Sequence, residues 1–498
     1  MQKVLSSNLK QFLTYLTGSL SQTALGFLLL PLYINRLTPG EYGRVSVLIT
    51  FNTILSLLAS SWVLSGLVRL YYEQADQQRH RMAATAIAWT TGITLFPVTG
   101  MFLTASSLSS ALFGSSAFAG EVRAASILLC VTTLPFGLCQ VLRLEKRATA
   151  FVMISVLGFL TDLTLKIYFI GVRGLGVEGY FISSILSSAL VVGASVSVMV
   201  RGMELTMDRD LLRKLLIFGG PFLFSGIGMW VLDISDRLIL NTFAGSEAVG
   251  IYTLASKLAS IFNIVLLGPL SLFWSPYLFS ISAEQGEEAL RRTCSKSFPL
   301  LAMVGGFLLV VIGCGASDLI RLFSHNMAYH QSSGLVPFLS LAPFLYMISL
   351  PAGSAILQSR QGRYSSYAVG VAAFVNLALN LVLVPRFSFY GATATTVVGY
   401  SVLCGLQHFW AQRLLPTAYD WMKLIKTVGS SGLGILVAMQ IHLEGPAVSL
   451  LAREVTGLTV FTLAIYLIGG RVSDLKYILD LVNRDLSRVP TPSQEVSL

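Results

Sequence analysis

The chain has 498 residues, of which 54% are hydrophobic and only 12% are charged, and its mean hydropathy is +0.72. Soluble domains carry about 25% charged residues, so this composition excludes an ordinary soluble protein. The net charge of +10 does not indicate a nucleic-acid partner, because Lys and Arg residues in a membrane protein serve to orient its helices. We therefore predict a multi-pass membrane protein.

Apolar runs of 18 or more residues recur along the chain, and each is long enough to cross a bilayer core about 30 Å thick. Their spacing predicts an all-α membrane protein with about 14 transmembrane helices. The predicted spans cover residues 11–34, 45–68, 83–104, 124–142, 150–171, 177–200, 215–240, 249–280, 298–320, 336–357, 366–384, 390–411, 427–443 and 455–470. The first run has no small-residue cleavage site at its end, so we do not expect a secretory signal.

The connections between the spans fall into two alternating sets, and the set with both termini holds most of the Lys and Arg residues. The other set holds only Arg36, Arg44, Arg123, Arg173, Arg386 and Arg453. This imbalance predicts that both termini lie in the cytoplasm. All connections are short, so we expect no soluble catalytic domain and no enzymatic activity.

Two pairs of segments suggest an internal repeat. GFLTDLTLKIYFIGVRGLGVEG (158–179) aligns with AFVNLALNLVLVPRFSFYGATA (373–394), with one residue of slippage, and LTPGEYG (37–43) echoes AGSEAVG (244–250). The first alignment places Asp162 on Asn376 and Lys166 on Asn380.

Repeats that lie six spans apart predict two parallel lobes of six helices, with a substrate site at their interface. We expect these lobes to cover residues 1–205 and 206–415. Residues 416–498 would then supply two additional transmembrane helices and a cytoplasmic tail.

Several charged residues lie inside predicted spans, where each costs about 2.5–3.5 kcal/mol near the helix centre and tends to face the bundle interior. Asp233 and Arg237 have the spacing and order of an intrahelical ion pair, and Asp162 and Lys166 repeat that spacing. One interpretation is that such pairs lock helices together, and the other is that they line a translocation cavity. The candidate anion-binding residues are Lys166, Arg237, Lys257 and Arg69; the supporting or ion-coupling acids are Asp162, Asp233 and Asp236.

Four stretches resemble motifs of bacterial polysaccharide flippases. FGGPFLFSGIGMWVLDISDRLILNTFAGSEAVGIYTLASKL (218–258) resembles the seventh-helix signature of that family, with its Gly-Pro, Asp-Arg and Val-Gly-x-Tyr elements. LTPGEYG (37–43), GLVRLYYE (66–73) and FWSPYL (273–278) resemble further family segments. By this resemblance, the chain is identified as a member of the multidrug/oligosaccharidyl-lipid/polysaccharide exporter superfamily, which implies a fold like that of multidrug and toxic-compound extrusion (MATE) transporters.

The resemblance implies a flippase that moves an undecaprenyl-pyrophosphate-linked oligosaccharide, such as an O-antigen, capsule or exopolysaccharide repeat unit, across the bacterial inner membrane by alternating access. Lys166, Arg237 and Lys257 would then bind the pyrophosphate through charge-assisted hydrogen bonds. Arg69 has the alternative of reaching cytoplasmic headgroups. The expected partners are the lipid-linked oligosaccharide, membrane lipids, a polysaccharide polymerase and chain-length proteins, with no nucleic acid. We expect no cofactor and leave open a coupling ion, either H+ or Na+.

Rival functions are a flippase for the peptidoglycan lipid precursor and a MATE-type drug or cation antiporter. The antiporter is disfavoured because many exporters of that branch carry an acid in helix one, and residues 11–35 contain none. An ATP-driven pump is disfavoured because the chain has no Gly-Lys dipeptide and hence no phosphate-binding loop of the P-loop type. The five His and five Cys residues show no metal-ligand spacing, so we expect no metal site.

Overall fold

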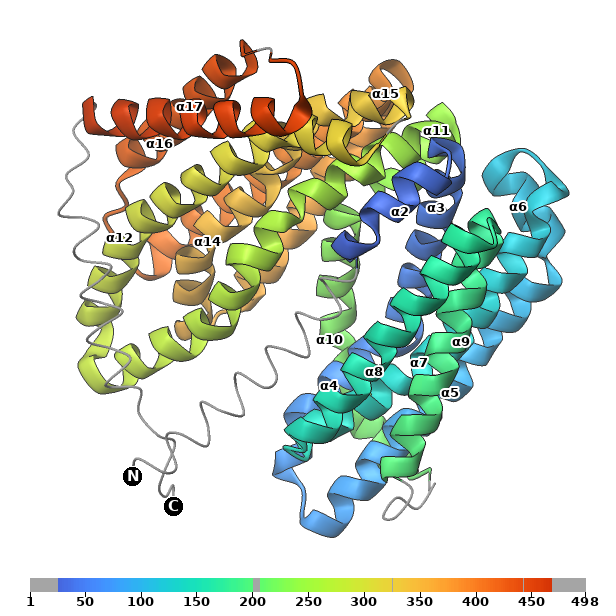
Figure 1. Ribbon diagram of the computed structural model, residues 1–498. Helices are drawn as coiled ribbons and strands as arrows, with labels where there is room; N and C mark the ends of the chain where they lie inside the picture. The colour runs from blue at the N-terminus through green and yellow to red at the C-terminus, as the bar shows by residue number, and fades with distance from the viewer. Residues whose placement is uncertain (1–25, 200–206, 325, 442, 468–498) are drawn as a thin grey trace.

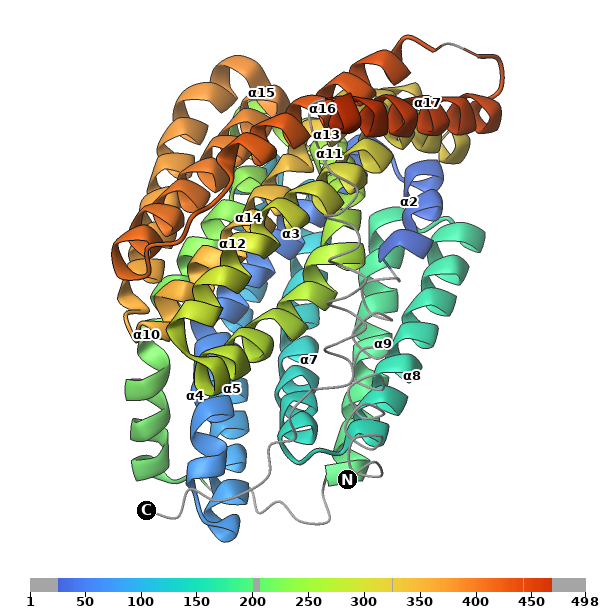
Figure 2. The same cartoon turned by 90° about the vertical axis from the view of Figure 1, so that its left-hand side faces the viewer.

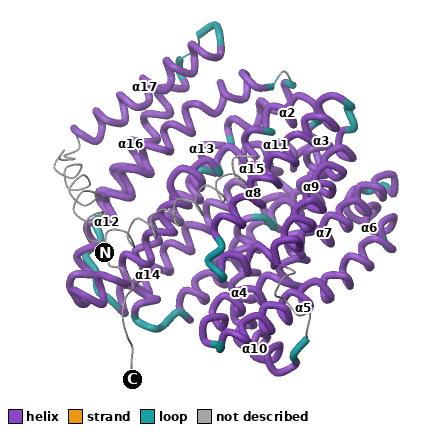
Figure 3. The backbone as a smooth tube through the Cα atoms, turned by 60° about the horizontal axis from the view of Figure 1, so that its bottom comes forward, coloured by secondary structure: helices purple, strands orange, loops and turns teal. Residues whose placement is uncertain are grey.

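The computed structural model describes residues 26–199, 207–324, 326–441 and 443–467, and within these ranges it consists of helices and connecting turns, without a strand (Figure 3). It contains 11 helical segments that are long and apolar enough to cross a membrane. The predicted all-α membrane fold is therefore confirmed. The first predicted span, 11–34, lies mostly outside the described residues.

Helices of the first half run side by side in one group (Figure 1). They are α2 (Leu30–Arg36), α3 (Pro39–Ser56), α4 (Trp62–Leu70), α5 (Asp76–Leu103), α6 (Ala105–Phe113), α7 (Ala119–Leu144), α8 (Ala148–Lys166) and α9 (Gly176–Met199). Two π-helical turns, η1 (Leu57–Ser61) and η4 (Ile167–Val172), continue α3 and α8, and the 3₁₀ turns are η2 (Tyr71–Glu73) and η3 (Ser116–Phe118).

Helices of the second half form the other group. They are α10 (Arg209–Asp233), α11 (Asp236–Ala259), α12 (Gly268–Phe323), α13 (Val336–Leu339), α14 (Leu341–Gln358) and α15 (Arg363–Leu414), with the π-helical turn η5 (Asn263–Leu267) and the 3₁₀ turn η6 (Met327–Gly334). Two further helices, α16 (Trp421–Met439) and α17 (Pro446–Leu467), follow them.

Single residues with left-handed backbone divide the longest of these helices. Gly245 in α11 has φ 79° and Gly286 in α12 has φ 81°, a region that glycine enters without steric penalty. Ser388 divides α15 in the same way, with φ 51°. Each long helix therefore contains two legs, and the predicted spans 366–384 and 390–411 correspond to the two legs of α15.

Each half has its own hydrophobic core. One core lies between α4, α5, α7, α8 and the start of α10, and includes Leu67, Leu142 and Phe151. The largest core joins α11, α12 and α14, and it also takes in Tyr33 of α2 and Tyr42 of α3. The beginning of the first half therefore packs against the second half at one end of the molecule.

The α16–α17 hairpin packs on α12 and lies at the same end of the molecule as α2 (Figures 1 and 2). Small residues permit this contact, because a side chain at Gly306 would meet Thr427. A buried ion pair adds to it: Nη1 of Arg453 lies 3.2 Å from Oδ2 of Asp318, and its guanidinium also donates to the carbonyl oxygen of Ile441. A packed, charged contact of this kind fixes the hairpin to the second half.

Candidate functional site

The seventh predicted span is interrupted at the position of its charges. Helix α10 ends at Asp233, Ile234 leaves the helical region with φ −138°, and α11 begins at Asp236. The predicted ion pair between the side chains of Asp233 and Arg237 is therefore wrong, because residues four apart face each other only along a continuous helix. Instead, Nη1 of Arg237 donates to the main-chain oxygen of Asp233 at 3.3 Å, and the Asp233 carboxylate accepts a hydrogen bond from Tyr400.

Asp236 is buried in the second half and is held by hydroxyl groups. Its Oδ2 accepts hydrogen bonds from Tyr252 and, at 3.3 Å, from Thr396, and these two hydroxyls lie 3.2 Å apart. Its Oδ1 is buried and has no hydrogen-bond partner among the described residues. Burial of a carboxylate oxygen without a partner is unfavourable, so this atom is a candidate acceptor for a proton or a cation.

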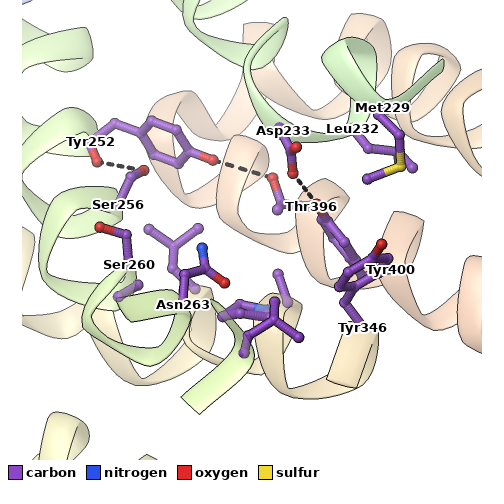
Figure 4. A pocket seen from close by; sticks show the side chains of 15 residues that line it. Met229, Leu232, Asp233, Tyr252, Ser256, Ser260, Asn263, Tyr346, Thr396 and Tyr400 are labelled. Atoms are coloured by element: carbon purple, nitrogen blue, oxygen red, sulfur yellow. Dashed lines mark hydrogen bonds between the residues drawn. The ribbon is translucent and has the colours of Figure 1, made fainter. Parts of the chain in front are cut away.

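A cavity of about 270 Å³ lies beside these acids, between α10, α11, α14 and α15. Asp233, Tyr252, Thr396 and Tyr400 line it (Figure 4). The remaining lining residues are Met229, Leu232, Ser256, Ala259, Ser260, Asn263, Leu267, Leu339, Ala342, Pro343 and Tyr346. The cavity therefore combines one acid with several hydroxyl groups and an apolar wall.

Asp162 and Lys166 form a buried ion pair within the first half. Nζ of Lys166 lies 2.6 Å from Oδ2 of Asp162, and the two side chains are only 5% and 11% exposed. Ser184 donates to the other oxygen of Asp162 at 3.3 Å, and the ring centroid of Tyr180 lies 4.4 Å from the Lys166 ammonium. The pair is thus held between α8 and α9, with an aromatic face against the cation.

Arg237 and Lys257, both on α11, are half-buried cations. Lys257 lies within electrostatic range of both Arg237 and Lys166, and its ammonium lies against the backbone of Gly26. Among the described residues neither Arg237 nor Lys257 forms an ion pair, and residues 1–25 contain no acid. Asp233 and Asp236 also lie within electrostatic range of Arg237, but hydroxyl groups of the second half bind both. The structure therefore brings three of the four predicted bases together.

Arg69 does not join the other three bases. Its side chain is 68% exposed near the end of α4, and its Nη2 lies 3.6 Å from the Glu73 carboxylate. Helix α4 lies at the end of the molecule opposite α2 (Figure 1). This position fits the alternative expectation for Arg69, a contact with lipid headgroups.

The aligned repeat segments also correspond in their side-chain contacts. In the second half, Nδ2 of Asn380 donates to Oδ1 of Asn376 at 3.1 Å, as Lys166 donates to Asp162 in the first half. Asn380 also accepts a hydrogen bond from Thr395 at 2.8 Å, and both Asn side chains are fully buried. Two amides therefore occupy the positions at which the first half carries an acid and a base.

In the part of the chain that the structure describes, no group of three or more His, Cys, Asp or Glu side chains could hold a metal ion. The five cysteines are free and lie in buried or half-buried positions. His408 packs among Phe298, Tyr419 and Trp421, with its Nδ1 2.9 Å from the carbonyl oxygen of Cys404. Its position is that of a packed aromatic residue.

A family-level sequence comparison matches residues 8–282 to the family described as "Polysaccharide biosynthesis protein". The chain belongs to this family. Among individual proteins, it is 22% identical over 294 residues to "Uncharacterized membrane protein MJ1068" of Methanocaldococcus jannaschii, a match that covers 57% of this chain and 56% of that relative. The chain thus matches little more than half the length of this curated relative.

Solved structures share the fold of this chain. "Lipid II flippase MurJ, inward closed conformation" has a TM-score of 0.69 at 15% identity, covering 96% of this chain and all of that one (100%). An "inward-facing conformation of a multidrug resistance MATE family transporter of the MOP superfamily" has a TM-score of 0.63 at 17% identity, covering 80% of this chain and 94% of that one. An outward-facing structure described in the same terms scores 0.56 at 16% identity, covering 80% and 93%. The predicted MATE-like fold is confirmed.

The sequence analysis did not predict a role for three tyrosines. Tyr180 lies against Lys166, Tyr252 donates to Asp236, and Tyr400 donates to Asp233. Tyr252 belongs to the Val-Gly-x-Tyr segment that supported the resemblance, so its motif was visible but its role was not. Hydrogen-bond donors facing buried acids can be recognised only after the helices are placed.

Proposed function

We propose that this chain is a flippase that carries an undecaprenyl-pyrophosphate-linked oligosaccharide across the bacterial inner membrane by alternating access between two lobes, without covalent chemistry. The polysaccharide biosynthesis family and the fold shared with flippase and transporter structures support this proposal. The cargo would be an O-antigen, capsule or exopolysaccharide repeat unit.

The convergence of Arg237 and Lys257 carries the proposal. Two half-buried cations without a carboxylate partner among the described residues are unfavourable in a membrane unless an anion binds them. A pyrophosphate supplies oxygens for both, with a bidentate contact to the guanidinium and a point-charge contact to the ammonium. Lys166 lies within electrostatic range of Lys257, so its positive charge would add to the attraction for the pyrophosphate.

The repeat supports a functional role for the charges of the first half. At the equivalent positions of the second half, Asn376 and Asn380 satisfy each other as neutral amides and are fully buried. Packing of two adjacent helices at this place therefore does not require an ion pair. The charges of Asp162 and Lys166 are therefore not required for helix packing. This favours the interpretation that the pair lines a translocation cavity over the interpretation that it locks helices together.

Asp233 and Asp236 would serve as the acids that bind a coupling ion, either H+ or Na+, beside the cavity. The unpartnered Oδ1 of Asp236 and the hydroxyl groups around both carboxylates supply oxygen ligands suited to a small hard cation, and they suit a proton equally well. Because both acids lie within electrostatic range of Arg237, occupancy by a cation would leave Arg237 more available to an anion.

We place both termini in the cytoplasm, on the basis of the Lys and Arg distribution between the connections. Arg237 and Lys257 then lie near the midplane of a bilayer core about 30 Å thick. Arg237 precedes the Gly245 break by eight residues and Lys257 follows it by twelve, which corresponds to about 12 and 18 Å at about 1.5 Å per residue. A polysaccharide polymerase and chain-length proteins would receive the cargo on the outer side.

A flippase for the peptidoglycan lipid precursor is the second candidate, favoured by the similarity over 96% of this chain to the lipid II flippase structure. Expression of the gene in strains that each lack one defined flippase distinguishes the candidates. Return of a surface glycan supports the proposal, and rescue of the strain without its lipid II flippase supports the second candidate. Rescue of drug efflux alone would overturn both.

Within the rescued strain, Arg237→Ala and Lys257→Ala should each depress glycan export while leaving the amount of membrane protein unchanged. Arg292→Ala is the matched control, because that arginine is 72% exposed and pairs with Glu288 on the surface. Unchanged export by both the Arg237→Ala and the Lys257→Ala variants would exclude these two residues from cargo binding.

A further inference from the structure

The cavity between α10, α11, α14 and α15 is lined by hydroxyl groups that donate their protons to other groups of the protein. These hydroxyls belong to Tyr252, Ser256, Ser260, Thr396 and Tyr400. Their acceptors are the carboxylates of Asp236 and Asp233 and main-chain oxygens of α11 and α15. A hydroxyl oxygen that donates its proton still offers lone pairs. The cavity therefore presents mainly hydrogen-bond acceptors to a ligand.

Two further polar groups of the cavity are available to a ligand. Asn263 and Tyr346 line it (Figure 4), and among the described residues neither the Asn263 amide nor the Tyr346 hydroxyl has a hydrogen-bond partner. Asn263 begins the π-helical turn η5, in which the main-chain N–H of Gly268 donates to the Asn263 carbonyl oxygen. Turns of this kind are frequent at functional sites. The amide both donates and accepts and the hydroxyl donates, so the two groups complement the acceptors around them.

The charge of the cavity excludes an anion. Asp233 lines it with an exposed side chain, and its lining residues in the described part of the chain include no Lys, Arg or His. A diphosphate carries acceptors and negative charge, and here it would face other acceptors and a carboxylate. A neutral ligand rich in hydroxyl groups would instead find acceptors for its protons. The cavity therefore fits a part of the cargo other than the diphosphate.

The walls and the size of the cavity suit one sugar ring. The rings of Tyr346 and Tyr400 lie 6.3 Å apart at an interplanar angle of 83°, and Met229, Leu232 and Pro343 add an apolar surface. A sugar ring has hydroxyl groups at its rim and C–H groups on its faces, so it needs both polar and apolar partners. The volume of about 270 Å³ lies just below the range of about 300–1,000 Å³ that is typical of sites for drug-sized ligands. A single ring fits such a space better than a whole oligosaccharide.

The cavity adjoins the two cations that the proposed function assigns to the diphosphate. Lys257 directly follows Ser256, which lines the cavity. The central guanidinium carbon of Arg237 lies 6.0 Å from the ring centroid of Tyr252, and Tyr252 also lines the cavity. In a lipid-linked oligosaccharide a single oxygen atom joins the first sugar to the diphosphate, so the two must bind side by side. The positions of the cations and the cavity match this covalent order.

We propose that this cavity binds the first sugar of the cargo, an uncharged ring, while Arg237 and Lys257 bind the diphosphate; the inference rests on the proposed function. Asn263 and Tyr346 are then specificity-determining residues, because they exchange hydrogen bonds with the sugar. A first sugar that carries a carboxylate is rejected, because its charge would face Asp233. The diphosphate is common to every cargo of this class, so the cavity supplies the selection among them.

Binding of three probes to the purified protein in lipid nanodiscs tests the proposal. The probes are undecaprenyl diphosphate alone, the same lipid with one N-acetylglucosamine residue, and the same lipid with one glucuronic acid residue. The N-acetylglucosamine probe should bind about tenfold or more tightly than the lipid alone, as expected for two or more added neutral hydrogen bonds. The glucuronic acid probe should gain nothing over the lipid alone. Equal affinity for the first two probes, or the highest affinity for the glucuronic acid probe, would overturn the proposal.

Two variants locate the effect in the cavity. Asn263→Ala and Tyr346→Phe should each weaken binding of the N-acetylglucosamine probe by about two- to tenfold, the effect of one lost hydrogen bond, and leave binding of undecaprenyl diphosphate unchanged. The surface variant Arg292→Ala should change neither affinity. An equal loss for both probes would contradict the assignment of these residues to the sugar.

The same measurements separate this inference from the proposed function. If the unmodified protein binds none of the three probes, the proposed function and the inference both fail. If it binds undecaprenyl diphosphate and gains nothing from the sugar, only the inference fails. The comparison of probes uses the unmodified protein, so it decides even if a variant does not fold.

Discussion

Asp162 and Lys166 form the ion pair of the first half. Replacing both by Asn, the residue found at both equivalent positions of the second half, tests whether the pair stabilises the fold or serves transport. Lys166→Asn alone leaves Asp162 buried, and among the described residues only the Ser184 hydroxyl, at 3.3 Å, would then remain as its hydrogen-bond partner. Removing one member of a buried pair costs about 3–5 kcal/mol, because the remaining charge is uncompensated. Asp162→Asn together with Lys166→Asn removes both charges and recreates the arrangement of Asn376 and Asn380, so we expect the free energy of unfolding to return to within about 1 kcal/mol of the unmodified protein.

Thermal unfolding in detergent gives the stabilities of the unmodified protein, the two single variants and the double variant. Glycan export in the complemented strain is measured on the same four proteins. We expect the double variant to be stable and defective in export. Equal destabilisation of the single and double variants would refute the assignment of the two side chains as one unit. Normal export by the double variant would refute a role for the Lys166 charge in transport.

Three further predictions follow from the contacts of other residues. Arg237→Lys keeps the charge but loses the bidentate fork, so cargo affinity in a binding assay should fall by about tenfold or more; an unchanged affinity would exclude a bidentate contact. Tyr400→Phe removes the hydrogen-bond donor to Asp233 and should change the dependence of export on pH or Na+, whereas an identical dependence would dissociate that acid from coupling. Arg453→Met leaves Asp318 buried without its base and should lower unfolding stability by about 3–5 kcal/mol, and Asp318→Asn in the same chain should recover most of that loss.

The sequence was sufficient to predict most of the long helices of this fold because long apolar runs are a strong, local signal. The division of α15 at Ser388 matches the two spans predicted there. The predicted pair of Asp233 and Arg237 failed because one non-helical residue, Ile234, interrupts the seventh span. No glycine or proline marks that break, so the sequence offered no local signal for it.

The candidate site was predictable in part. Lys166, Arg237 and Lys257 are recognisable because a charge within an apolar run is rare, and the structure brings Lys166 and Arg237 within electrostatic range of Lys257. Arg69 shares that local signal, but it lies in the last turn of α4 and is exposed beside Glu73. Distinguishing it from the others required the three-dimensional placement of α4.

The contact between α3 and α11, where a Cβ atom on Gly43 would lie 1.7 Å from the carbonyl oxygen of Ser246, illustrates a third case. The echo between residues 37–43 and 244–250 was visible in the sequence, but nothing in it indicated that the two copies contact each other. That contact depends on the relative placement of the two halves, and therefore on packing between residues about two hundred positions apart.

Binding of undecaprenyl diphosphate to the purified protein in lipid nanodiscs tests the central claim most directly. Each charge-assisted hydrogen bond is worth about 1.5–3 kcal/mol, so Arg237→Ala with Lys257→Ala should weaken binding by about 100-fold or more. The control variant Arg292→Ala should bind as the unmodified protein does. Equal affinity of the unmodified and doubly substituted proteins for the diphosphate would contradict the proposal that these two cations hold the cargo.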